Sequence, residues 1–172
     1  MLSCPQRFIA FFCCVLMFST PARADIGTEI QALLSSGQAQ QALVRAQAAV
    51  AANPRDPQAR FMLGLVSMEL GKNAEAMAIF MQLAQQYPEL PDPLNNIALL
   101  HVRANALPLA LEALESALRN DPSHTLARTN LAEVHLMLAV QVWEKLAAEG
   151  ALSAATAQRL KTVRGQLQPA SR

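Results

Sequence analysis

The sequence predicts an all-α solenoid in which helix pairs of equal length stack side by side. Three kinds of marker residue recur with a spacing of 34 residues along the middle of the chain. They are a proline, an alanine and a glycine or asparagine: Pro54, Pro88 and Pro122; Ala42, Ala76 and Ala110; Gly37, Gly71 and Asn105. Because three independent markers keep one phase, each period is one structural unit that packs against its neighbours.

Each marker has a physical role in a helix pair. Glycine or asparagine accepts the left-handed backbone that ends the first helix, and the small alanine lets the second helix approach closely. Proline stops the chain from continuing as a helix between units. We expect Asp56 and Asp92, each followed by proline, to cap the helices that begin there, and Ser123 to be the equivalent cap after Pro122.

These signals predict three helix pairs, in units at about 23–56, 57–90 and 91–124. The six helices are expected at 26–36, 39–52, 57–70, 73–87, 93–104 and 107–119. A single pair cannot bury its own apolar stripe, so neighbouring pairs stack and the stack curves.

A partial fourth unit occupies residues 123–149. No glycine or proline lies between Ser123 and Gly150, and Ala139 stands where the earlier units have their turn residue, so we predict one long unbroken helix. A second helix at 152–167, capped by Ser153, is expected to cap the solenoid, with Trp143 as its contact. The alternative is that this terminal helix folds back into the concave groove until a partner displaces it.

The unit at 57–90 carries Leu63-Gly64, Gly71, Ala76, Phe80 and Pro88. At these residues the chain resembles the tetratricopeptide repeat, and the resemblance covers about residues 25–142. The resemblance implies a right-handed solenoid of three helix pairs, followed by the long fourth helix and the capping helix. It also implies that the first helix of each pair lines the concave side.

Carrying that inner face onto this sequence gives a partner-binding groove. Its residues are Phe61, Leu65, Met68, Glu69, Asn95, Leu99, Val102, Arg103, Thr129, Glu133, Leu136 and Met137. The face is mainly aliphatic, which suits an apolar peptide or helix, and we expect Glu69, Arg103 and Glu133 to set specificity. The alternative is that several of these side chains only pack against their own neighbours.

Residues 1–24 have the order of a secretory signal peptide. Arg7 precedes an apolar run too short for a membrane span, and Ala22 and Ala24 provide the small residues of a cleavage site. We predict cleavage after Ala24, a mature domain at 25–172 and a periplasmic or secreted location, with no stable membrane span after cleavage. The alternative is an uncleaved N-terminal anchor. All three cysteines lie in this segment, so the mature chain has no disulfide.

Charge and motifs restrict the function. The mature chain carries 12 cations (14 less Arg7 and Arg23) against 13 acids, which does not suit a nucleic-acid binder. Motifs for a nucleophile, a metal protease or a phosphate loop are absent, so we expect no enzyme and no cofactor. His101 and His135 lie one period apart without a third ligand in phase, so no metal site is predicted.

The stretch NLAEVHLMLAVQVWEK, residues 130–145, resembles a pattern of some bacterial envelope repeat proteins. This resemblance implies an envelope setting and says little about activity. The leading hypothesis is a non-catalytic adaptor that binds another envelope protein or peptide through the concave groove. The alternatives are a structural scaffold that self-associates into a homo-oligomer, and an accessory factor for peptidoglycan or envelope assembly enzymes.

Overall fold

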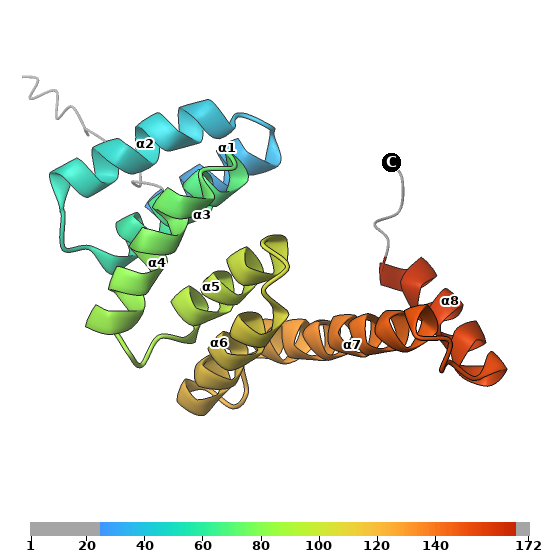
Figure 1. Ribbon diagram of the computed structural model, residues 1–172. Helices are drawn as coiled ribbons and strands as arrows, with labels where there is room; N and C mark the ends of the chain where they lie inside the picture. Colours follow the sequence, from blue (N-terminus) through green and yellow to red (C-terminus); the bar gives the residue numbers. More distant parts are fainter. Residues whose placement is uncertain (1–24, 168–172) are drawn as a thin grey trace, which may run out of the picture.

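A computed structural model describes residues 25–167 of the chain, so the predicted signal peptide at 1–24 lies outside the described residues. Within this range the chain forms eight α-helices, shown in Figure 1. They are α1 (Ile26–Ser35), α2 (Ala39–Ala52), α3 (Pro57–Glu69), α4 (Asn73–Gln86), α5 (Pro91–Arg103), α6 (Leu107–Asn120), α7 (Thr125–Ala148) and α8 (Ala154–Leu167). None of the helices in this described range is both long and apolar enough to cross a bilayer.

The helices pack sequentially as a solenoid, and the predicted all-α fold class is confirmed. Each helix from α1 to α7 packs against the next one along the chain, and α1 also packs against α3 and α5 against α7 (Figure 1). The helix positions agree with the predicted ranges to within two residues in the three pairs. The domain and repeat boundaries drawn around these helices remain a prediction.

The turns within the three pairs have the backbone that the markers predicted. Gly37, Gly71 and Asn105 adopt φ of 73°, 72° and 55°, in the left-handed region. The next backbone N–H in each unit donates to a carbonyl five residues back, from Gln38 to Leu33, Lys72 to Ser67 and Ala106 to His101, at 2.8, 2.8 and 2.9 Å. This bond satisfies an otherwise unpaired carbonyl of the first helix, as in a Schellman cap.

The predicted cap at Asp56 is confirmed, because its carboxylate accepts the backbone N–H of Gln58 at 2.9 Å. The predicted cap at Asp92 is wrong. Helix α5 begins at Pro91, with Leu90 at the cap position, so Asp92 lies inside the first turn. Proline has no N–H to lose and its fixed φ suits the first helical position, which explains the earlier start.

The predicted cap at Ser123 is also wrong. The hydroxyl and the backbone N–H of Ser123 both donate to the Asp121 carboxylate, at 2.6 and 2.9 Å. His124 caps α7 instead, since its Nδ1 accepts the backbone N–H of Ala127 at 3.1 Å. The turn held by Asp121 and Ser123 thus leads into α7, whose first turn is capped by the imidazole of His124.

The second unit has a close approach between its two helices at Gly64. A Cβ at Gly64 would lie 2.6 Å from Cε1 of Phe80, so only glycine fits there without displacing the ring. Phe80 is fully buried and its ring centre lies 5.6 Å from that of Phe61, at 55°. The main core continues from Phe80 into the third unit, while a separate cluster around Ile30 and Val66 holds the first unit.

Helix α7 is unbroken over 24 residues and ends at Ala148, and Gly150, two residues further on, has a φ of 71°. The predicted cap of α8 is confirmed, because Ser153 Oγ accepts the backbone N–H of Thr156 at 3.2 Å. Helix α8 packs against α7, with Arg164 Nη1 3.6 Å from Glu144 Oε1. In Figure 1 it lies at the far end of α7 from α1–α4, so α8 does not fill the groove in this structure.

Candidate functional site on the inner face of the first helices

The first helices α1, α3, α5 and α7 have equivalent positions 34 residues apart, which place their side chains in four rows. The rows are Gly27–Phe61–Asn95–Thr129, Gln31–Leu65–Leu99–Glu133, Leu34–Met68–Val102–Leu136 and Ser35–Glu69–Arg103–Met137. We call these rows the inner face. All twelve predicted groove residues belong to it, and they occupy its positions on α3, α5 and α7.

The apolar centre of the inner face is half-buried. Phe61, Leu65, Met68 and Val102 pack against the main core while keeping part of their surface exposed. Leu136 on α7 is more open, with 44% of its surface exposed. The first four side chains therefore contribute to packing, and all five leave an apolar surface exposed on the inner face.

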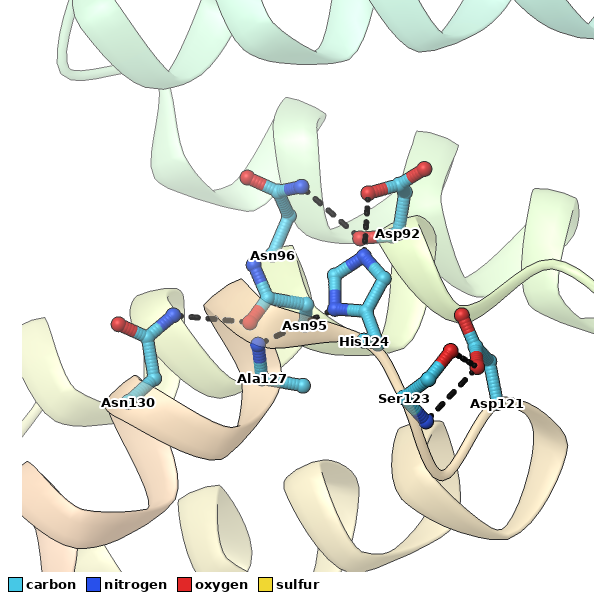
Figure 2. Close-up of polar contacts among 8 residues, drawn as sticks. All are labelled: Asp92, Asn95, Asn96, Asp121, Ser123, His124, Ala127 and Asn130. Carbon is cyan, nitrogen blue, oxygen red and sulfur yellow. Dashed lines mark hydrogen bonds and ion pairs between the residues drawn. The ribbon is translucent and has the colours of Figure 1, made fainter.

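Asn95 is a buried member of the inner face. It is only 4% exposed, and its Oδ1 accepts Nδ2 of Asn130 at 2.8 Å, as Figure 2 shows. A buried amide needs such a partner, because an unpaired polar group in the interior is costly. The pair ties α5 to α7, so in this structure Asn95 holds the two helices together and is covered.

The charged positions of the inner face are exposed at its surface, at Glu69, Arg103 and Glu133. Arg103 Nη1 donates to the backbone carbonyl oxygen of Met68 at 2.8 Å, which links α5 to the last turn of α3. Cations favour the C-terminal end of a helix, where carbonyls lack partners. Thr129 is exposed as well, and its hydroxyl donates to the carbonyl of Thr125 at 3.0 Å.

Three hollows lie between successive first helices. The hollow between α1 and α3 has a volume of about 540 Å³ and includes Gln31 and Ser35 among its lining residues. The hollow between α3 and α5 has about 210 Å³ and contains Phe61, and a smaller pocket of about 30 Å³ between α5 and α7 contains Leu99. Counting back one period from Leu65 and Glu69 would have identified the α1 positions that the sequence prediction omitted.

A polar cluster joins the start of α5 to the start of α7 (Figure 2). His124 Nε2 lies 3.0 Å from Asp92 Oδ1, and the Asp92 carbonyl accepts Nδ2 of Asn96 at 2.8 Å. Since His124 Nδ1 accepts the Ala127 N–H, that nitrogen carries no proton, so Nε2–H must be the donor to Asp92. The ring is therefore neutral in this arrangement.

The two histidines one period apart do not lie in a metal-binding cluster. His101 on α5 is half-buried and His135 on α7 is exposed. Within residues 25–167 no group of three or more histidine, cysteine, aspartate or glutamate side chains is placed to hold a metal ion. The inner face therefore offers apolar surface and a few charges as its means of recognition.

A family model of the tetratricopeptide repeat matches residues 28–91 and 95–138, more than half of the chain. Among solved structures, the chain is similar to YrrB, described as a TPR protein with an unusual peptide-binding site. The identity is 28% and the TM-score 0.56, over 61% of this chain and 54% of that chain. This chain thus spans about half the length of YrrB.

Two further structures share the fold. The first is TTC0263, a thermophilic TPR protein of Thermus thermophilus, with 22% identity and a TM-score of 0.61 over 66% of this chain and 64% of that one. The second is the first TPR domain of Spaghetti (RPAP3) bound to the HSP90 peptide SRMEEVD, with 16% identity and a TM-score of 0.58 over 66% of this chain and 90% of that one. A comparison with curated protein sequences found no match.

Proposed function

The chain belongs to the tetratricopeptide repeat family, and on that premise we propose that it is a non-catalytic adaptor in the bacterial envelope. It binds a peptide or helix of another envelope protein on its inner face. The observation that carries this proposal is the half-buried apolar centre of that face, which crosses α3, α5 and α7. Apolar segments that lie across such a surface are recognised by a few anchoring side chains.

Binding of this kind needs shape and apolar contact and no chemical step. Tetratricopeptide repeat proteins are generally non-catalytic, and no enzyme family matches the chain. The hollows beside Phe61 and Leu99 would receive apolar anchors of the partner, while Glu69, Arg103 and Glu133 select among partners. Met68 and Met137 have flexible thioether side chains that adapt to differently shaped anchors.

The envelope location is part of the proposal and is supported by sequence alone. Residues 1–24 have the order of a signal peptide, and residues 130–145 resemble a pattern of envelope repeat proteins. Mass spectrometry of the exported protein should give an N-terminus at Asp25. A mature protein that retains Met1 and the apolar run would contradict cleavage.

The adaptor function is tested by capture from a crosslinked envelope extract. The bait variants are wild type, Leu99→Asp/Leu136→Asp, and Leu109→Asp as a matched control. Leu109 lies on α6, a second helix, and its exposure of 49% is close to the 44% of Leu136. We expect the inner-face variant to lose partners that Leu109→Asp still captures. At least one of these partners should bind the purified wild-type protein directly. An unchanged partner set would reject the inner face as the binding surface.

Self-association is the second candidate, and the open end of the solenoid favours it. Ala132 and His135 on α7 are exposed, whereas Ala98 and His101, one period earlier, are buried and half-buried. Helix α6 packs against α5, whereas α7 continues without a turn and, among the described residues, the helix that follows it is α8 at its far end. Light scattering should then give a mass that rises with concentration and falls in Ala132→Glu. A constant monomer mass would exclude this candidate.

A further inference from the structure

We propose that the segment bound by the inner face is basic as well as apolar, with lysine or arginine residues beside its apolar anchors. This inference rests on the proposed function, since it describes the partner of the same surface. It follows from the charges that border the three hollows between successive first helices, and from the hydrogen bonds that hold those charges in place.

Each of the three hollows is bordered by one carboxylate. Asp25 lines the hollow between α1 and α3, Asp92 the hollow between α3 and α5, and Glu133 the pocket between α5 and α7. The residues that line these hollows, all within 25–167, include no lysine, arginine or histidine. An apolar anchor in any of the hollows would therefore lie beside a negative charge.

Neutral side-chain donors hold two of these carboxylates. The Asp25 carboxylate also lies beside the α-ammonium group of the proposed mature N-terminus, so the uncancelled negative charges are those of Asp92 and Glu133. Gln58 Nε2 donates to Asp25 Oδ2 at 2.9 Å. His124 Nε2–H donates to Asp92 Oδ1 at 3.0 Å, and the ring is neutral because its Nδ1 accepts the backbone N–H of Ala127. Each hydrogen bond fixes the position of a carboxylate, and the bond to Asp92 leaves its negative charge available to a ligand.

The remaining charged residues of the inner face do not make its net charge positive. Arg103 contributes a positive charge, but its Nη1 is hydrogen bonded to the Met68 carbonyl oxygen, and Glu69 lies next to Arg103 in the same row. Within the described residues, no lysine, arginine or histidine side chain lies within ion-pair distance of Asp25, Glu69 or Glu133. The face therefore repels an acidic peptide and attracts a basic one.

The bound segment can be identified without assuming its sequence. A library of random 16-residue peptides displayed on phage is selected against the purified protein and against Leu136→Asn, which removes an exposed apolar side chain of the inner face without adding charge. Glu133→Gln tests the charge, and Glu112→Gln on α6 is its matched control, since Glu112 is exposed outside the inner face. Circular dichroism verifies that each variant is folded.

We expect the peptides that depend on Leu136 to be apolar with a net positive charge. Their affinity should fall roughly two- to fivefold in Glu133→Gln, the scale of one exposed charge pair, and stay unchanged in Glu112→Gln. Peptides that depend on Leu136 but are neutral or acidic would overturn this inference and leave the adaptor function intact. A selection that yields no peptide dependent on Leu136 would overturn both.

Discussion

Replacing Gly64 by alanine should destabilise the protein, although alanine is the better helix former. The added methyl group would lie 2.6 Å from Cε1 and 2.8 Å from Cζ of Phe80. Real Cβ atoms do not approach other atoms so closely, so the ring must move. Phe80 is fully buried and its ring contacts that of Phe61 in a tilted arrangement, so a shift of the Phe80 ring would disturb its contact with the inner face.

The size of the effect follows from two opposing contributions. Forcing a methyl group into a packed core costs about 1–3 kcal/mol. Replacing glycine by alanine within a helix contributes about 1 kcal/mol in the opposite direction. We therefore expect Gly64→Ala to lower the free energy of unfolding by about 1 kcal/mol. Gly165→Ala in α8 is the matched control, because nothing lies within 4 Å of its added Cβ, and it should be neutral or stabilising.

Urea denaturation followed by circular dichroism measures both variants, and a double mutant identifies the cause. Phe80→Leu leaves space beside Gly64, so Gly64→Ala/Phe80→Leu should be more stable than the sum of the single changes predicts, by about 1 kcal/mol. Equal stabilities for Gly64→Ala and Gly165→Ala would refute the reasoning, because the Phe80 ring would then yield without cost.

Three further outcomes are expected. Asn130→Leu should cost about 1–3 kcal/mol in urea denaturation, because it leaves the buried Asn95 amide oxygen without its donor. Hydrogen bonds from the Ser123 hydroxyl and then from its backbone N–H lower the pKa of Asp121. Their stabilising contribution is therefore present above the usual aspartate pKa and is lost as pH falls through the lowered value. Thermal denaturation should show that Ser123→Ala destabilises the protein at pH 7 and has a smaller effect in strong acid. Deleting α8 should expose Trp143 to water and shift its fluorescence to longer wavelength. An unchanged spectrum would show that α8 does not cover Trp143.

The fold was predictable because its markers act locally. A left-handed glycine or asparagine and a closing proline each act within one turn of backbone, and the small alanine acts between the two helices of a pair. The period of these markers therefore reveals the helix pairs. The caps of α5 and α7 were not predictable in the same way. Asp92 and Ser123 were both plausible caps, and the choice of His124 coincides with a hydrogen bond to Asp92, 32 residues away.

The sequence predicted which positions lie on the inner face better than it predicted which of their side chains are exposed. Position alone placed Asn95 on the inner face, but its burial depends on a hydrogen bond to Asn130, a residue in the next unit. The inner positions of α1, Gln31, Leu34 and Ser35, were omitted because the prediction carried the inner face onto the second, third and fourth units only. Tertiary partners that lie one period away therefore decide which residues of a predicted face are available to a ligand.

The long helix α7 sets the length of the inner face. Its first half follows the register of α5, up to Met137, and then Ala139 continues the helix where Asn105 ends the earlier one. The residues after Ala139 extend for about 14 Å at 1.5 Å per residue and have no counterpart in the other first helices. Glu144 in this extension pairs with Arg164 of α8. The missing turn thus ends the inner face after four first helices and leaves the rest of α7 to pack against α8.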